Sequence, residues 1–405
     1  MDEGGRKVEP LSSAGAEWEI QQSLDYSCSK PGQKERCCDK IGEYRVKLVP
    51  SKTKLLVFST ENQKFIVDHA KLTSKITIGG EAVEFVTEGE HVGIMRNIDG
   101  NLPNLLLRIS AHKQSMGAVM SAGLARGRRG NPAASLKMSQ LYGTPVLFSG
   151  LGSLVLSPAE TKIIDHHYQQ TIQNLQRLHD KTPRCLVFLM AGSLTGEAIL
   201  HLKQLTLFIM ICHLPGDPLN IHARATLLSA PNSARSWFQQ IYKLCLMYGL
   251  DHPLFMLDNP PPKKTFKKLV KQAVCSYWEN ILKDEAASLP SLHLFVATNC
   301  SVQFTHPIWT SAASNSYECH KSTVLARMVS GRYRTDYLAR HWTSNKNGFC
   351  LLDSCHKVVS DLGHLLITCQ GLSQVRDRMR QMLILRTGSL IPLNQLIKRI
   401  LFSPQ

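Results

Sequence analysis

The sequence predicts an α+β fold that is mostly helical, with short antiparallel strands first and a small zinc-knuckle-like element near the C-terminus. Three observations predict this fold. Apolar residues alternate around a Gly-Gly pair, apolar residues recur at spacings of three and four after residue 101, and three cysteines share a short window with a histidine. A chain of 405 residues is long enough for two or three domains.

The chain is expected to divide into four segments, separated by changes in composition and pattern. The segments are a disordered leader at 1–43, antiparallel strands at 44–100, a helical region at 101–258, and a helical C-terminal region at 263–405 with the zinc element at 350–369. The Pro-rich stretch DNPPPKK, which is stiff, marks the boundary before the last segment.

The strand segment contains one apolar run and one hairpin pattern. Lys54 to Phe58 forms the apolar run, and Ile76 and Ile78 alternate with polar residues farther along. Gly79-Gly80 suits a tight turn before Val83 and Phe85. We therefore expect two or three antiparallel strands in this segment.

The helical region has clear start and stop signals. Ser157 suits an N-cap, Pro158 the first helical position and Glu160 a capping box. The apolar stripe that follows ends before Pro183 and consists of Ile164, Tyr168, Ile172, Leu175 and Leu178. Further helices are predicted at 196–218, at 233–250 with Gly249 as C-terminal cap, and at 264–282, 317–342 and 374–388.

The charge balance points to a polyanionic partner. Lys and Arg number 47 against 31 Asp and Glu, a formal net charge of +16, which favours nucleic acid or an anionic membrane. The uncharged window from Met138 to Ala159 is interrupted by glycines and a proline, so we expect no membrane span. The opening residues MDEGGRKVEP are charged and have no apolar run, so we expect no secretion signal there. We expect an intracellular protein, cytoplasmic or nuclear, whose cysteines serve as thiols or metal ligands.

The window CLLDSCHKVVSDLGHLLITC has the spacing C-x4-C-x8-H-x4-C. Its Cys350, Cys355, His364 and Cys369 would form a closed tetrahedral set for one structural Zn²⁺. His356 is a rival ligand, although it adjoins Cys355. The alternative interpretation is that the cysteines are apolar core residues and the histidine is incidental, because cysteine is often buried.

Basic residues gather in three stretches. The first is a glycine-flanked loop at 125–132. The second is a lysine-rich helix start at 263–271, whose lysines we expect to form a solvated face. The third, at 326–340, interleaves arginine with tyrosine just before the cysteine window. Arginine beside aromatic residues suits phosphate contact and base stacking. The candidate nucleic-acid-binding residues are Arg126, Arg128, Arg129, Arg327, Arg332, Tyr333, Arg334, Tyr337 and Arg340.

No catalytic centre stands out in the sequence. The phosphate-binding loop, nucleophile-elbow and zinc-protease motifs do not occur, and neither does Asp-Asp. Asp165, His166 and His167 share a helix and are expected on its surface. We therefore assign no catalytic residues, no enzyme activity and no small-molecule substrate.

Four stretches resemble a known family. Residues 44–58, 75–94, 129–160 and 182–218 are similar to the region after the catalytic palm motif of jockey-like non-LTR retrotransposon reverse transcriptases. Lys52 and Lys54 match a lysine-bearing strand, and His91-Val92-Gly93 matches the primer-grip hairpin. The family often ends in a cysteine-histidine zinc element, which the four candidate ligands match. Gly363 stands where the family is commonly acidic.

The resemblance implies a strand remnant of a polymerase palm, then a helical thumb and connector, then a zinc element. It implies binding of RNA or DNA without polymerase activity, because the catalytic aspartates are not encoded in this chain. Two alternatives remain open: a helical protein-interaction module that self-associates through an exposed palm-remnant face, and a pseudogene-like product.

Overall fold

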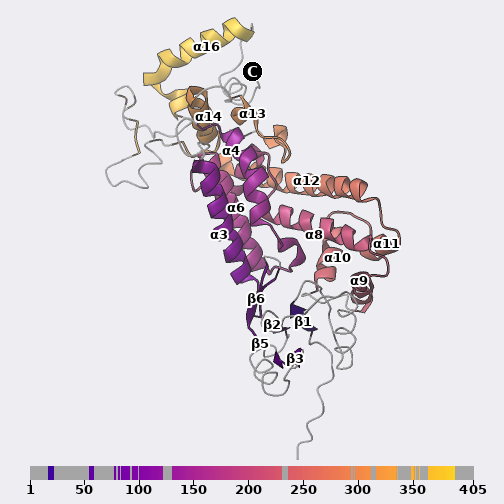
Figure 1. Cartoon of the computed structure of the whole chain (residues 1–405). Coiled ribbons are helices and arrows are strands. Elements are labelled where there is room, and N and C mark those ends of the chain that lie inside the picture. Colours follow the sequence, from indigo (N-terminus) through magenta and orange to yellow (C-terminus); the bar gives the residue numbers. More distant parts are fainter. Residues whose placement is uncertain are drawn as a thin grey trace, which may run out of the picture. The chain divides into compact units, whose positions relative to one another are not determined.

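The structure is a computed structural model, drawn in Figure 1. Its compact units are Met1–Arg108 and Ile109–Gln405. It describes residues 17–21, 54–58, 77–78, 81–82, 84–91, 94–98, 100–121, 130–229, 236–292, 295, 297–311, 316–333, 335, 348–350, 352, 355 and 364–387. Over these residues the fold is mostly helical with small sheets, as predicted. The assignment of palm and thumb stays a prediction.

The first unit contains short strands in small sheets. The strands are β1 (Glu17–Gln21), β2 (Lys54–Phe58), β3 (Thr77–Ile78), β4 (Glu81–Ala82), β5 (Glu84–Phe85), β6 (Glu88–His91) and β7 (Ile94–Asn97). β3 pairs with β4 and β6 with β7, both antiparallel. The antiparallel pairing predicted on either side of Gly79-Gly80 is confirmed for Thr77–Ile78 and Glu81–Ala82, whereas Phe85, expected in the same hairpin, lies in β5 and pairs with β2.

The largest sheet departs from the prediction in two ways. β1 lies inside the expected disordered leader and pairs antiparallel with β2. β5 pairs with β2 in parallel, with Lys54 opposite Glu84, whereas we expected antiparallel strands only. A parallel pair needs a long connection, so the local alternation of residues cannot reveal it.

The second unit begins within α3 (Leu102–Val119) and continues through short turns. These are α4 (Pro132–Met138), a π turn (Ser139–Gly143), α5 (Thr144–Leu147) and a 3₁₀ turn (Leu151–Ser153). The uncharged window predicted not to span a membrane lies among these turns. Of the helices in the described ranges, none alone has both the length and the apolar content of a membrane span.

The helix α6 (Pro158–Leu175) has the predicted start. Ser157 accepts from the N–H of Glu160 and the Glu160 carboxylate accepts from the N–H of Ser157, which completes the capping box. All residues of the predicted stripe are buried. The helix ends earlier than Pro183, and Arg177 just beyond it has a left-handed backbone with φ of 57°.

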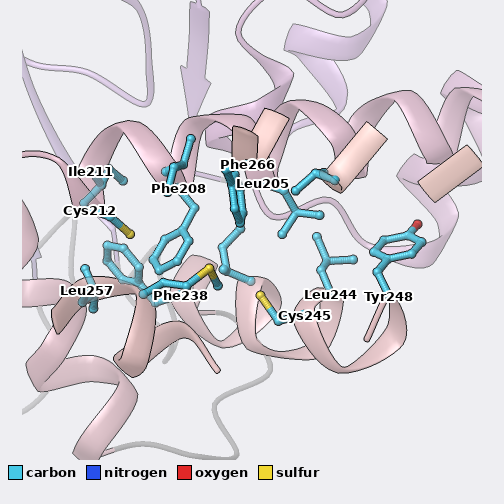
Figure 2. Packing of buried hydrophobic residues seen from close by; sticks show 14 of the residues in the cluster. Leu205, Phe208, Ile211, Cys212, Phe238, Leu244, Cys245, Tyr248, Leu257 and Phe266 are labelled. Carbon is cyan, nitrogen blue, oxygen red and sulfur yellow. The ribbon is translucent and has the colours of Figure 1, made fainter. Parts of the chain in front are cut away.

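The next six helices are α7 (Arg184–Ala191), α8 (Gly196–Cys212), α9 (Pro218–Ser229), α10 (Trp237–Met247), α11 (Pro253–Asp258) and α12 (Lys263–Ser288). Residues from α8 to α12 form the buried cluster of the main core. Three of them, α8, α10 and α12, were predicted. Figure 2 shows how Phe208, Phe238 and Phe266 from these helices meet in one cluster. Gly249 has φ of 63°, as expected for a C-terminal cap.

The expected boundary at the Pro-rich connector does not separate two compact units. Phe266, Val270 and Val274 of α12 belong to the same buried cluster as Leu205 of α8. Both sides of the connector lie within Ile109–Gln405. The connector is a stiff corner inside one unit, because the apolar face of α12 is buried against the preceding helices.

The last described elements are short except for two helices. They are 3₁₀ turns at Pro290–Leu292 and Ala297–Asn299, α13 (Pro307–Thr310), α14 (Ser316–Val329), a π turn (His364–Thr368), a 3₁₀ turn (Gln370–Leu372) and α16 (Ser373–Thr387). α14 is shorter than the predicted helix at 317–342. Gly331 ends it with φ of 65°, and the N–H of Arg332 donates to the carbonyl of Arg327 in a Schellman-type arrangement.

Candidate metal centre

The structure brings the four predicted ligands together. Each of Cys350, Cys355, His364 and Cys369 offers one ligand atom, and these atoms all lie within 4.8 Å of one another. The Sγ of Cys369 lies 3.9 Å from that of Cys350 and 3.6 Å from that of Cys355. Residues up to 19 positions apart therefore converge on one point. The cluster can hold a metal ion.

The sulfur separations fit ligands of one metal. A disulfide would place two sulfurs about 2.05 Å apart, which these distances exclude. For metal–sulfur bonds of about 2.3 Å, tetrahedral geometry places two sulfurs about 3.8 Å apart. The separations of 3.9 Å and 3.6 Å lie on either side of that value. The cysteines are therefore spaced as ligands.

A π turn positions the second half of the ligand set. It spans His364–Thr368, and the N–H of Cys369 donates to the carbonyl of His364 at 2.7 Å. A turn that closes over five residues is wider than an α-helical turn. The x4 spacing thus places His364 and Cys369 on the same side of one turn. The sequence indicated their proximity, but not this kind of turn.

The environment of Cys369 favours a bound cation. Cys369 is fully buried, and burial raises the pKa of its thiol, with the neighbouring thiols of Cys355 and Cys350 acting in the same direction. Three sulfurs this close would repel one another if all were ionised, so ionisation needs a cation at the centre. Cys369 stands at the N-cap position of the 3₁₀ turn that leads into α16, and its side chain makes no capping hydrogen bond there.

A hydroxyl orients the imidazole ligand. The Oγ1 of Thr368 lies 3.2 Å from Nδ1 of His364. A metal-binding histidine usually hydrogen-bonds through its other ring nitrogen, which fixes the ring and its tautomer. This contact would leave Nε2 of His364 to face the sulfurs. Leu372 packs against the cysteines and shields them. The sequence analysis did not single out Thr368, whose spacing of four from the histidine is the signal that was available.

The four-ligand set is closed. Around a bound metal, three sulfurs and one nitrogen would complete tetrahedral coordination and leave no open position for a substrate, which is typical of structural sites. Among the described residues, no other group of three or more Cys, His, Asp or Glu side chains lies close enough together to hold a metal ion. Burial raises the pKa of the Cys212 and Cys245 thiols to about 12, so these residues behave as apolar core side chains.

The predicted nucleic-acid-binding residues are only partly described. Arg327 is exposed at the end of α14, and Arg332 and Tyr333 follow it, both half-buried. The other predicted residues lie outside the described residues, namely Arg126, Arg128, Arg129, Arg334, Tyr337 and Arg340. Their proposed role stays a prediction.

A residue that the sequence analysis missed connects two of the basic stretches. Arg177 donates from Nη2 to the carbonyl of Gly130 at 2.6 Å, and Gly130 follows the glycine-flanked arginines in the sequence. Arg327 donates from Nε and Nη2 to the carbonyl of Arg177, at 3.0 and 2.8 Å. Segments 150 residues apart thus meet at Arg177. No local sequence pattern predicts an arginine with a left-handed backbone, so Arg177 could not be identified from the sequence.

The residues Asp165 and His167 are not simple surface residues. Asp165 accepts from the N–H groups of Gly196 and Glu197 at the start of α8, and it pairs with Arg184 at 3.0 Å. His167 lies 2.9 Å from His112 of α3. Both residues were expected on the surface, but Asp165 joins α6 to α7 and α8, and His167 joins α6 to α3.

Comparison of the chain with models of known protein families, with curated proteins and with solved structures returned no match. The assignment of the metal centre depends on the type, separation and burial of its four ligands.

Proposed function

We propose that the chain is a nucleic-acid-binding protein whose C-terminal segment is held together by one structural Zn²⁺. The observation that carries the proposal is the convergence of Cys350, Cys355, His364 and Cys369 within 4.8 Å. Zinc is the metal that prefers mixed thiolate and imidazole ligands in a tetrahedral set. Small closed sites of this kind commonly shape segments that contact nucleic acid.

The distribution of positive charge supports nucleic acid as the partner. The chain carries a formal net charge of +16. Two cationic side chains, Arg177 and Arg327, are held beside each other through the carbonyl of Arg177. Arg327 donates only two of its five N–H groups to that carbonyl, so the other three can donate to a phosphate. Two adjacent arginines repel each other, and a phosphate would relieve that repulsion.

The resemblance to non-LTR retrotransposon reverse transcriptases supports the same partner. In that family the region after the palm handles an RNA template and the growing DNA, so we propose RNA or DNA as the ligand. We also propose that the chain by itself does not polymerise, because the paired aspartates that bind catalytic magnesium are not encoded. Primer extension on an RNA template with Mg²⁺ tests this part, and incorporation above background by the chain alone would refute it.

Nucleic-acid binding is tested by fluorescence anisotropy with a labelled single-stranded RNA over a range of salt concentrations. The wild-type chain should bind with an affinity that falls steeply with salt. Arg327→Gln should weaken binding and lower the salt slope by about 0.7, the value for one lost phosphate contact in a single strand. The matched control is Lys321→Gln on the same helix, whose ammonium already pairs with Glu318 at 2.9 Å. Equal effects of the two changes would argue against a contact at Arg327.

A second function is favoured by exposed apolar side chains in the main unit. Leu228 of α9 is 70% exposed and Leu246 of α10 is 63% exposed. Large exposed apolar residues can mark a protein-interaction surface. Under this alternative the chain would associate with itself or with another protein in a salt-insensitive manner, and RNA binding would be weak. Sedimentation at several salt concentrations separates the two functions.

A further inference from the structure

The start of α12 presents a dense row of lysines. Five lysines occupy nine consecutive positions, and all five side chains are exposed: Lys263, Lys264, Lys267, Lys268 and Lys271. Their spacing of one, four, five and eight residues from the first places them on one side of the helix. At a rise of about 1.5 Å per residue the row is about 12 Å long. We call these five residues the lysine face.

The lysine face stands on a fixed support. The opposite side of α12 buries Phe266, Val270 and Val274 in the main core (Figure 2 labels Phe266). The turn before the helix is held by His213, whose Nε2 donates to the carbonyl of Pro261 at 2.9 Å. The buried side of α12 and the fixed turn before it set the orientation of the helix, so the lysine face stays directed away from the core.

The carboxylates nearest in sequence are committed to other groups. Asp258, before the connector, pairs with Arg224. No acidic residue occurs from 259 to 278, and the next one, Glu279, pairs with Lys283 at 2.7 Å and accepts from the N–H of Val302. Among the ion pairs of the described ranges, none includes a residue of the lysine face. The positive charge of the lysine face is therefore not neutralised by an ion pair with any of these carboxylates.

This charge lies at the unfavourable end of the helix. The first turn of α12 contains no acidic residue, and Pro262 supplies no side-chain cap. Cations in the first turn of a helix, here Lys263 and Lys264, oppose the helix dipole. The arrangement lowers the stability of the chain alone. A bound polyanion would reverse that effect, because it would meet both the ammonium groups and the positive end of the helix.

We propose that the lysine face of α12 binds the phosphate backbone of the nucleic acid. The inference rests on the proposed nucleic-acid binding and names a second contact surface for it, formed by residues that the sequence alone favoured as a solvated face. An anionic membrane fits less well, because a membrane-surface helix inserts its apolar side, whereas that side of α12 is buried. A row of lysines gives backbone contacts without sequence preference.

The test compares two triple variants of equal charge in the full chain. One variant replaces Lys264, Lys267 and Lys268 with glutamine. The control replaces Lys113, Lys137 and Lys162 with glutamine, three exposed lysines on α3, α4 and α6. Anisotropy with a labelled single-stranded RNA measures affinity against salt. We expect the first variant to lose affinity and to lower the salt slope by about 2, since each lost phosphate contact in a single strand removes about 0.7. The control should change much less.

Each outcome decides a different claim. If the wild-type chain shows no salt-dependent RNA binding, the proposed function itself fails. If the wild type binds but both triple variants lose affinity equally, only net charge matters and the lysine face is not a contact. Binding of the wild type to phosphatidylserine vesicles in place of RNA would also overturn the inference. Thermal unfolding shows whether the variants are folded. The melting temperature of the first variant should not lie below that of the wild type, because the substitutions remove positive charge near the positive end of the helix dipole.

Discussion

The sulfur atoms of Cys355 and Cys369 lie 3.6 Å apart, although fourteen positions separate these residues in the sequence. This separation is too long for a disulfide and close to the edge of a tetrahedron of metal-bound sulfurs. Cys350 and His364 complete the set. The proposed zinc would therefore replace the extended apolar core that so short a segment cannot build.

Replacement of Thr368 should weaken zinc binding without removing a ligand. Thr368→Val removes the hydroxyl that lies 3.2 Å from Nδ1 of His364. Loss of such an orienting contact typically lowers metal affinity about 10–100-fold. Competition with a chromogenic chelator measures the affinity. Thr368→Ser keeps the hydroxyl and should behave like the wild type. Equal affinity of all three proteins would show that the contact does not orient the ring.

Removal of zinc should loosen the C-terminal segment and leave the main core intact. The buried cluster of α8, α10 and α12 includes no residue of the metal centre, whereas the cysteines pack mainly with one another and Leu372. Hydrogen exchange with and without a chelator locates the effect. Protection should fall at 364–387 and persist at 196–212. Loss of protection throughout the unit would contradict a local role for the metal.

The residue Gly192 should tolerate no side chain. It has φ of 62° at the end of α7, and a Cβ there would collide with the backbone carbonyl of Phe304. The backbone at Phe304 is held in place, because the hydroxyl of the next residue, Thr305, donates to the carbonyl of Ala191 at 3.2 Å. Gly192→Ala should therefore destabilise the protein by about 2 kcal/mol or more. Urea unfolding measures the change.

The matched control for that variant lies in α3. Gly117 has open space around the position of a Cβ and stands inside a helix. Gly117→Ala should stabilise the protein by up to about 1 kcal/mol, since alanine is the better helix former. If both substitutions have the same effect, the close approach of Phe304 to Gly192 is not a real constraint.

Buried histidines should make the protein sensitive to mild acid. Burial lowers the pKa of His201 from its ordinary value of 6.5 to about 4, and Nδ1 of His201 lies 2.8 Å from the hydroxyl of Tyr248. The unfolded chain binds this proton more readily than the folded chain. The stability is thus complete above pH 6.5 and is lost as the pH falls from 6.5 toward 4.

Trp278 contributes to the fluorescence signal for this test, and its Nε1 donates to the same Tyr248 hydroxyl. The free energy of unfolding, followed by tryptophan fluorescence, should decrease between pH 7 and pH 5 in the wild type. His201→Gln cannot take up the proton and should show a smaller decrease. The metal centre also responds to acid, so both proteins are measured with chelator present. Identical pH profiles would exclude His201 as a contributor.

The sequence predicts elements whose causes are local. The start of α6 follows from Ser157 and Glu160, which contact each other three residues apart. The metal ligands were found because ligand type and short spacing carry the signal. By contrast, α7 was missed, since its eight residues are too few and too uniformly apolar to show a helical period.

Other features depend on contacts between distant segments. The parallel pairing of β5 with β2 joins strands about thirty residues apart, and the sequence of neither strand contains a pattern that predicts this pairing. Arg177 receives two hydrogen bonds from Arg327, 150 residues away. The connector at 259–262 has the composition of a linker, yet α12 packs into the preceding core. In each case tertiary contacts decide what the local composition leaves open.

The most direct test of the metal centre is the zinc content of the purified full chain, measured by mass spectrometry beside two variants. We predict about one zinc per chain in the wild type. Cys369→Ala should lose it. Cys275→Ala, which removes a cysteine that is buried in α12 away from the centre, should retain it. Folded wild-type protein without zinc, or equal zinc in both variants, would contradict the account.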